Sequence, residues 1–248
     1  MGSPELVIVR NEVDSNCEYH CDALADQFPD AREVDYPAGE RPDLDRAAGV
    51  VLTGSTVGVY EVDDRPWIAD QQRLVRDLID RELPTLGVCF GHQLVNAALG
   101  GTVEHVGTTC QPVEASFADD PLFADVSSIV PVAHGDVVTE AGAGLDVIAS
   151  AEYYEVFGTR HREAPLWTVQ FHPEFTAALR DRLVADFGWT DGGGGSGGGG
   201  REENGNGNGT ETDTGSGTEA GFEAIDAARV CENFRSIVAE MDGSDVRS

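Results

Sequence analysis

A cysteine between two glycines is the first feature of this sequence that could do chemistry. In the stretch LGVCFGHQ, an apolar run ends on Cys89, with Gly87 and Gly91 two residues to either side. A strand that turns sharply into a helix can push one side chain out at the edge of a sheet, and glycine neighbours give the backbone the freedom that this turn needs. The spacing therefore predicts a nucleophile elbow with Cys89 at its tip.

A reactive cysteine needs a stabilised thiolate and a base. The helix predicted after the elbow would favour the thiolate through its free N–H groups and its dipole, and the Phe90 N–H would serve as one oxyanion donor. Among the six histidines, His172 is the best placed, because it ends the apolar run of LWTVQFHPEF. Pro173 fixes the next turn, and Glu174 can orient the imidazole through its other nitrogen. We therefore predict a triad of Cys89, His172 and Glu174.

The stretches GVCFGHQ and QFHPE, in this order and about 80 residues apart, resemble the class I glutamine amidotransferase family over roughly residues 5–190. The resemblance implies that Cys89 attacks the side-chain amide of L-glutamine, forms a γ-glutamyl thioester and releases ammonia. It implies that His172 is the general base and acid and that Glu174 is its orienting carboxylate.

Further stretches resemble family motifs around the glutamine pocket. VLTGSTVG stands where the family has a glycine-rich turn that gives the second oxyanion N–H, with a serine in a place often held by a second glycine. AHGDVVT resembles the family's S-H-x-D stretch, from which Ala133 departs. The resemblance implies substrate-binding roles for Gly54, Ser55, Phe90, Gln93, Gly135 and Asp136.

The other histidines are interpreted as structural. His92 is expected to steady the elbow, and His134 to pack beside the pocket. No partner pattern marks His20, His105 or His161, which we interpret as surface or hydrogen-bonded histidines.

The remaining cysteines show no disulfide framework and no complete metal site. Cys17, His20 and Cys21 could share a helix face and hold a metal, but no second Cys/His pair of matching spacing follows. We prefer small residues that pack a helix against a sheet, and we expect Cys110 and Cys231 to be buried. The predicted chemistry requires no metal and no organic cofactor.

An α/β fold is expected to position these residues. Strand-like and helix-like segments alternate up to residue 100, which predicts a three-layer sandwich with a mostly parallel, flavodoxin-like central sheet. After residue 102, short strands joined by turns predict a smaller mixed or antiparallel sheet, with a short helix at 120–126. The expected strands are 5–10, 31–36, 47–55, 83–90, 102–106, 111–117, 127–139, 145–152, 155–161 and 165–171, and the helices are 17–28, 65–80 and 92–100.

Composition divides the chain into three parts. Residues 1–190 form the predicted amidotransferase domain, and residues 191–218 form a disordered linker rich in Gly, Asn and acidic residues. Residues 219–248 contain a C-terminal helix that cannot stand alone, so it should dock on the domain or on another chain.

The charge of the chain limits its partners. Asp and Glu number 45 against 16 arginines, with no lysine, for a formal net charge of −29. We therefore expect no nucleic-acid partner and an acidic surface suited to high salt. With no long apolar segment and no signal peptide in sight, we expect no membrane association and a cytoplasmic location.

Three functions fit these features. The first is a glutaminase that supplies ammonia to a synthetase on a separate chain, as in GMP synthetases, because no S-G-G-x-D-S loop and no G-x-x-x-x-G-K-[ST] loop for activating an acceptor occurs here. The second is a stand-alone γ-glutamyl hydrolase, and the third is an inactive binding module. The intact Cys89, His172 and Glu174 favour the enzymes.

Overall fold

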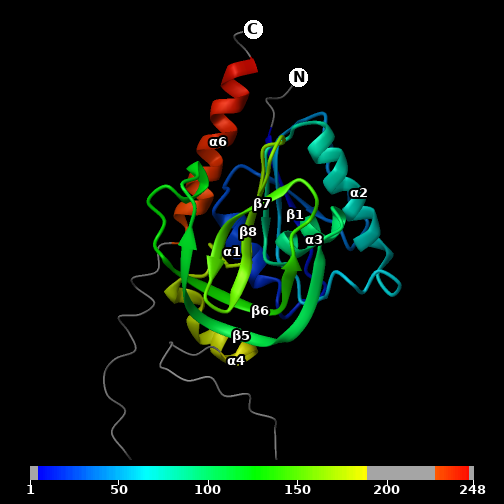
Figure 1. Cartoon of the computed structure of the whole chain (residues 1–248). Coiled ribbons are helices and arrows are strands. Elements are labelled where there is room, and N and C mark those ends of the chain that lie inside the picture. Colours follow the sequence, from blue (N-terminus) through cyan, green and yellow to red (C-terminus); the bar gives the residue numbers. More distant parts are fainter. Residues whose placement is uncertain (1–4, 189–226, 246–248) are drawn as a thin grey trace, which may run out of the picture.

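The chain is built around one mixed β-sheet of nine strands (Figure 1). The computed structural model describes residues 5–188 and 227–245. The strand order is β2-β1-β3-β4-β9-β8-β7-β5-β6. The strands are β1 Glu5–Arg10, β2 Arg32–Asp35, β3 Ala47–Leu52, β4 Thr85–Val88, β5 Thr102–Phe117, β6 Ile129–Glu140, β7 Leu145–Ala151, β8 Tyr154–His161 and β9 Leu166–Val169.

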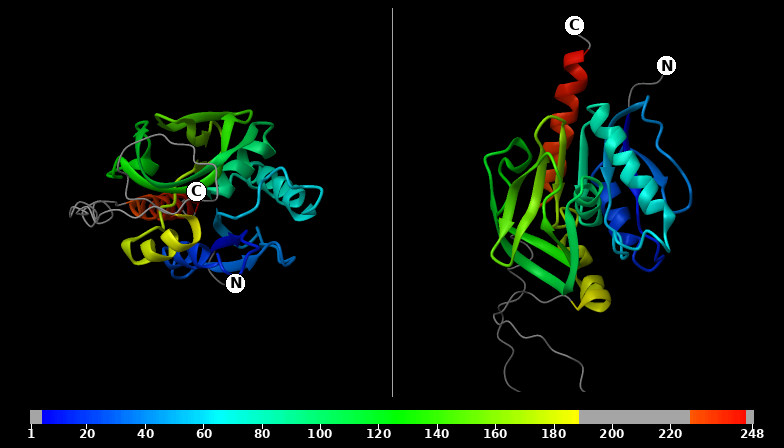
Figure 2. Two further views of the ribbon diagram at one scale, coloured as in Figure 1. Left: turned by 90° about the horizontal axis from the view of Figure 1, so that it is seen from below. Right: turned by 45° about the vertical axis from the view of Figure 1, so that its right-hand side comes forward.

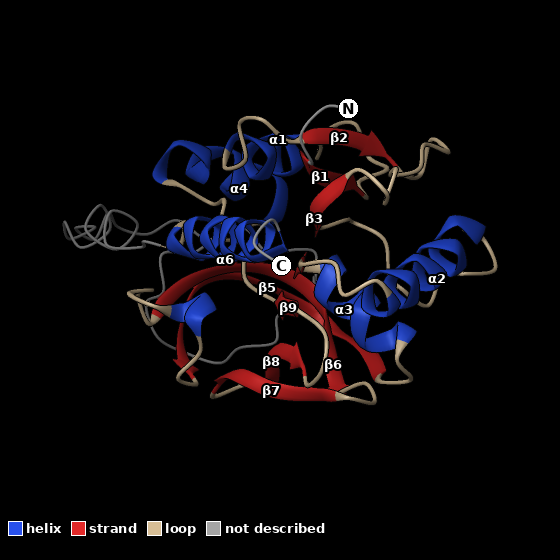
Figure 3. Cartoon of the chain, turned by 90° about the horizontal axis from the view of Figure 1, so that it is seen from above, coloured by secondary structure: helices blue, strands red, loops and turns tan. Residues whose placement is uncertain are grey.

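Five strands, β2, β1, β3, β4 and β9, form the parallel half of the sheet. Its central strands are apolar without alternation, as in Val7, Ile8 and Val9 of β1, because helices cover both of their faces. Helices α1, α4 and α6 lie on one side of these strands, and α2 and α3 on the other (Figure 3). The prediction of an α/β fold is confirmed. The helices are α1 Tyr19–Asp26, α2 Pro66–Asp80, α3 Phe90–Ala98, α4 Arg180–Phe187 and α6 Arg229–Asp245, with 3-10 turns at Pro121–Phe123 (η1) and Ala177–Leu179 (η2).

The antiparallel half differs from the predicted second sheet. Strand β8 pairs antiparallel with β9, so β8, β7, β5 and β6 extend the parallel strands as one continuous sheet. The predicted strands 102–106 and 111–117 are one long strand, β5, which curves around the molecule (Figure 1). Its register with β6 shifts between His105 and Thr109. Gly107 takes a φ of 96° there, a conformation that glycine adopts without strain.

Helix α6 packs against the remainder of the described molecule and projects past it at one end (Figure 2). Its residues Val230, Cys231, Phe234 and Val238 are buried in the main core cluster. The Phe234 ring meets the Phe28 ring edge to face at a centroid distance of 6.4 Å. The C-terminal helix is thus part of the same apolar core as the sheet.

The predicted linker, residues 191–218, lies outside the described residues. The division of the chain into domain, linker and terminal helix therefore stays a prediction. None of the helices in the described ranges is long and apolar enough to cross a membrane.

Candidate active site

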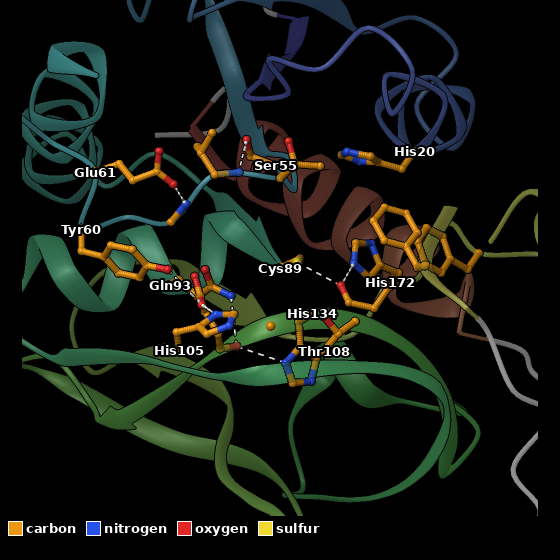
Figure 4. A pocket seen from close by; sticks show the side chains of 18 residues that line it. His20, Ser55, Tyr60, Glu61, Cys89, Gln93, His105, Thr108, His134 and His172 are labelled. Carbon is orange, nitrogen blue, oxygen red and sulfur yellow. Dashed lines mark hydrogen bonds and ion pairs between the residues drawn. The ribbon is translucent and has the colours of Figure 1, made fainter. Parts of the chain in front are cut away.

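Loops that follow the carboxyl ends of three parallel strands, β3, β4 and β9, line one cavity of about 270 Å³, and the segment after β1 lies next to the loop after β3 (Figure 4). Glu12 follows β1, residues 53–58 follow β3, Cys89 follows β4, and His172 follows β9. Parallel strands present their carboxyl ends at the same sheet edge, where α/β proteins commonly bind ligands. The topology thus gathers residues that are far apart in the sequence.

The turn at Cys89 is strained and closely packed. Cys89 has φ 52° and ψ −103°, a conformation that non-glycine residues rarely adopt. A methyl group on Gly87 would come within 2.8 Å of the Gly91 carbonyl group, and one on Gly91 within 2.5 Å of the Leu52 carbonyl oxygen. The two glycines therefore let β4 turn directly into α3 while α3 lies against the end of β3.

Cys89 and His172 face the same backbone carbonyl group. The Cys89 Sγ lies 3.9 Å from the Ala133 oxygen, and the His172 Nε2 lies 3.3 Å from it. Helix α3 begins at Phe90, and the Gln93 N–H donates to the Cys89 carbonyl oxygen at 3.1 Å. The thiol thus sits at the N-terminus of α3, beside the free N–H groups of its first turn.

Glu174 holds the other nitrogen of His172. The His172 Nδ1 lies 2.7 Å from Glu174 Oε1, and the two side chains are 5% and 0% exposed. A carboxylate can only accept, so Nδ1 carries the proton. Burial alone would lower the pKa of His172, but the charges of Glu174 and Cys89 and hydrogen bonds with both raise it well above the usual value. Phe175 stacks on the imidazole with a centroid distance of 4.1 Å.

An acidic group lies at the other end of the cavity. Asp136 Oδ1 accepts from His105 Nδ1 at 2.8 Å and from the Tyr60 hydroxyl at 3.3 Å. Gln93 Nε2 donates to the Asp136 carbonyl oxygen at 3.4 Å and to Gln170 Oε1 at 3.3 Å. This end offers a carboxylate and an amide to a bound molecule (Figure 4).

The loop after β3 forms the wall opposite the elbow. The Ser55 hydroxyl donates to the Asn11 carbonyl oxygen at 2.7 Å, so it is engaged by the scaffold. The Gly58 N–H donates to Glu61 Oε1 at 2.7 Å, and this bond is the main cause that lowers the pKa of Glu61. A methyl group on Gly54 would lie 3.3 Å from His20 Cε1 and 3.4 Å from His172 Cε1.

The structure brings most of the predicted site residues to this cavity. Glu174 lies behind His172, while Gly54 and Phe90 are not among the lining residues. The predicted residues that line the cavity are Ser55, Cys89, Gln93, Gly135, Asp136 and His172.

His92 and His134 are both buried and neutral. His92 bonds to Thr168, Tyr154 and the Val156 carbonyl oxygen, and burial lowers its pKa to about 3.

His134 Nδ1 donates to the Asp136 carbonyl oxygen, so its Nε2 accepts from the Tyr153 hydroxyl at 2.9 Å. Burial and then the charge of His172 lower the pKa of His134 to about 4. It lines the cavity as a neutral group.

Two histidines that line the cavity, His20 and His105, were not predicted from the sequence to belong to the site. His20 is bonded to Glu12, eight residues earlier, and His105 to Asp136, 31 residues later. Neither spacing is a recognised motif, but Glu12 follows a predicted strand at the same sheet edge as Cys89, which is the signal that could have found it. Within the described ranges, no group of three or more His, Cys, Asp or Glu side chains is arranged to hold a metal.

Helix α6 lies close behind the His172–Glu174 pair. Burial and then the negative charge of Glu174 raise the pKa of the Cys231 thiol well above its usual value. Phe171, which precedes His172, belongs to the same core cluster as Cys231. The terminal helix therefore closes the core on which the proposed triad is mounted.

Solved structures share this fold. A glutamine amidotransferase from Thermotoga maritima superposes with a TM-score of 0.63 at 22% identity and covers 75% of this chain and 84% of its own. A proposed GMP synthase subunit from Thermoplasma acidophilum superposes with a TM-score of 0.64 at 18% identity and covers 99% and 98%.

Sequence comparison goes beyond the fold. A glutamine-hydrolysing GMP synthase of Mycobacterium marinum is 38% identical over 128 residues, which are 50% of this chain and 23% of that protein. That of Thermosynechococcus vestitus is 35% identical over 130 residues, 51% and 23% of the two chains. The match thus spans about a quarter of the length of these relatives. The family model for glutamine amidotransferase class-I matches residues 16–189, and the chain belongs to the class-I glutamine amidotransferase family.

Proposed function

We propose that this chain hydrolyses the side-chain amide of L-glutamine through a thioester on Cys89. The observation that carries the proposal is the strained Cys89 in one cavity with a hydrogen-bonded His172–Glu174 pair. The order of the parallel strands, β2-β1-β3-β4-β9, supports a flavodoxin-like plan, in which ligands bind outside the carboxyl ends of the strands.

The first half-reaction makes the thioester. The Cys89 thiolate attacks the amide carbon of glutamine, the C–S bond forms, and the carbonyl electrons move to oxygen. The Phe90 N–H and a backbone N–H of residues 54–58 stabilise this oxyanion. Collapse breaks the C–N bond, the His172 imidazolium gives its Nε2 proton to the leaving nitrogen, and ammonia departs.

The second half-reaction frees the enzyme. The neutral His172 takes a proton from water as the water attacks the thioester carbon. The C–S bond breaks, glutamate leaves, and Cys89 returns as a thiolate beside an imidazolium. Glu174 stabilises the imidazolium and holds the ring in place throughout. We propose that Asp136 and Gln93 bind the amino-acid end of glutamine, since Asp136 offers the carboxylate that an ammonium group requires.

We propose that the ammonia passes to a synthetase on a separate chain. The matched region of the GMP synthase relatives is about a quarter of their length, and the Thermoplasma acidophilum protein that shares the fold over 98% of its length is a proposed synthase subunit. The expected behaviour is slow hydrolysis alone and faster hydrolysis with the partner, which co-purification would identify.

The test is ammonia release from L-glutamine in several molar KCl, a condition chosen because we propose that the acidic surface suits high salt. Cys89→Ser should reduce release to background, because the hydroxyl is a far weaker nucleophile at neutral pH. The matched control is Cys17→Ser, a buried cysteine that does not line the cavity. Release that survives in Cys89→Ser would overturn the role of Cys89.

A γ-glutamyl hydrolase is the second candidate, favoured by one observation. The cavity wall on the His172 side includes Phe175 and Phe187, which would face a leaving group larger than ammonia. Amine release from a γ-glutamyl anilide and from L-glutamine, compared by kcat/KM, separates the two. Preference for glutamine supports the glutaminase, and preference for the anilide supports the hydrolase.

A further inference from the structure

A second histidine–carboxylate pair, buried and outside the proposed triad, lies at the same edge of the sheet. His20 Nε2 and Glu12 Oε2 are 2.8 Å apart, and their side chains are 6% and 1% exposed. Two ionisable groups this deeply buried are stable only when they satisfy one another or other polar groups. The pair therefore needs a structural or functional explanation.

Glu12 is fully occupied by the protein itself. Its Oε1 accepts from the Val13 N–H, the Asp14 N–H and the Thr56 hydroxyl at 2.8, 2.9 and 2.6 Å. Its Oε2 accepts from the Thr56 N–H at 2.9 Å, besides His20. A carboxylate has about four lone-pair sites, so these bonds saturate it. Glu12 thus links chain segments by hydrogen bonds and has no acceptor site left for a substrate.

The segment that Glu12 ties is the cavity wall opposite Cys89. The N–H and the hydroxyl of Thr56 both donate to Glu12, and the neighbouring Ser55 hydroxyl donates to the Asn11 carbonyl oxygen. Two successive residues of the loop after β3 are therefore fixed to the segment after β1. Residues 55–58 line the cavity.

His20 joins this hydrogen-bonded group to the proposed base, because its ring packs against that of His172. Its ring lies edge to face with the His172 ring at a centroid distance of 6.2 Å, and Gly54 fits between the two rings. Burial lowers the pKa of His20, but hydrogen bonds with Cys21 and Glu12 outweigh it and raise this pKa to about 10. The bond of His20 to Glu12 is charge-assisted and holds the geometry firmly.

We propose that Glu12 and His20 are positioning residues that hold residues 54–58 where a backbone N–H meets the oxyanion formed at Cys89. The inference rests on the proposed function, since it needs a reaction at Cys89. A donor aimed at the oxyanion gains strength only in the transition state. Loosening the loop should therefore lower kcat and leave KM nearly unchanged, and a displacement of about 1 Å can cost about 100-fold.

The decisive variant is Glu12→Gln in the full chain. Glutamine has the same shape, but its NH₂ group must face one of the donors that Glu12 now accepts from, which pushes Thr56 or His20 away. We expect kcat for ammonia release to fall about 100-fold with KM within about threefold. The matched control is Glu18→Gln, which removes the same charge from an exposed position of the same segment and should change neither constant.

A pair of His20 variants separates hydrogen bonding from packing. His20→Gln keeps a donor for Glu12, whereas His20→Leu fills the space without one. The proposal expects His20→Gln to retain most of kcat and His20→Leu to lose it. Equal activity of the two variants would overturn the proposal, as would a Glu12→Gln enzyme whose kcat is unchanged or whose KM alone rises.

A labelling experiment distinguishes failure of this proposal from failure of the proposed function. A chloroketone analogue of L-glutamine forms an oxyanion when Cys89 attacks it, whereas alkylation by iodoacetamide forms none. Glu12→Gln should slow Cys89 labelling by the chloroketone much more than labelling by iodoacetamide. This ratio is measurable even if the unchanged chain releases no ammonia, which would refute the glutaminase alone. Equal slowing of both reactions would overturn the positioning role.

Discussion

At the residue scale, four buried histidines lie near one cavity, and their pKa values are shifted in opposite directions because their partners differ. The charge of Glu174 raises the pKa of His172, and hydrogen bonds with Cys21 and then Glu12 raise that of His20. His92 and His134 bond to neutral groups, and burial lowers their pKa values to about 3 and about 4. A charge inside the protein survives only beside an opposite charge. Neighbouring groups thus raise the pKa values of two of these imidazoles, and burial lowers those of the other two.

The neutral pair predicts a loss of stability in mild acid. The pKa of histidine in the unfolded chain is near 6.5. Below this pH, His92 and His134 bind protons in the unfolded chain but not in the folded chain. The free energy of unfolding should therefore fall as the pH is lowered from about 6.5 to about 5, by up to about 1.4 kcal/mol per pH unit for each histidine. Carboxylates mostly titrate below this window. Denaturant unfolding of the unchanged chain and of His134→Gln measures the effect.

His134→Gln should have a shallower dependence on pH than the unchanged chain. Ser236→Ala, which alters an exposed residue without a titratable group, is the control and should keep the original slope. An unaltered slope in His134→Gln would mean that folded His134 does take up a proton.

At the element scale, the elbow depends on how closely α3 approaches β3. Gly91 lies in the first turn of α3, and its Cα faces the Leu52 carbonyl oxygen at the end of β3. The packing of these two elements brings the N-terminus of α3 to the cavity. The glycines around Cys89 thus serve the contact between elements as well as the conformation of the turn.

Gly91→Ala separates these contact effects from helix propensity. Propensity alone would make alanine more stabilising by about 1 kcal/mol. The added methyl group would lie 2.5 Å from the Leu52 oxygen, and such overpacking costs about 1–3 kcal/mol. We expect a net loss of stability in thermal unfolding together with reduced ammonia release. Gly39→Ala has open space around it but takes a φ of 98°, so it should lose stability through backbone strain and leave ammonia release unchanged, which separates lost stability from lost activity. A more stable and fully active Gly91→Ala would contradict the steric argument.

At the scale of the whole molecule, α6 joins the core although it comes last in the chain. Phe234 is fully buried and contacts Phe28, and Asn233 donates to the Leu122 and Ala124 carbonyl oxygens. Cys231 of the same helix lies near Glu174. The helix thus links the stability of the core to the proposed catalytic pair.

Phe234→Ala should destabilise the entire fold. Removing a fully buried phenylalanine side chain costs about 3–5 kcal/mol, so the midpoint of denaturant unfolding should fall strongly. Ser236→Ala, at an exposed position of the same helix, is the control and should change little. If Phe234→Ala unfolds like the unchanged chain, α6 is not held on this core in solution, and a role in binding another protein would be favoured.

From the sequence alone, the family and the α/β class could be predicted, and the spacing of Cys89, His172 and Glu174 indicated a candidate site. Cys89 between two glycines and His172 two residues before Glu174 are short-range patterns, and short-range patterns express what neighbouring residues do to the backbone. The order of strands and helices in the first half was also readable, because apolar periodicity is local. The continuity of β5 could not be predicted, because the residues around Gly107 suit a turn between two strands as well as a bend within one strand.

Which distant residues come into contact could not be predicted without the three-dimensional structure. The bonds from Glu12 to Thr56, from His105 to Asp136 and from Asn233 to Leu122 join segments separated by 44, 31 and 111 residues. Such contacts depend on strand order and on the fit of packed elements, and the sequence shows neither. The extension of the parallel sheet through β8, and the place of α6 behind Glu174, follow from the same cause: burial of apolar surface selects among arrangements that local patterns leave equally open.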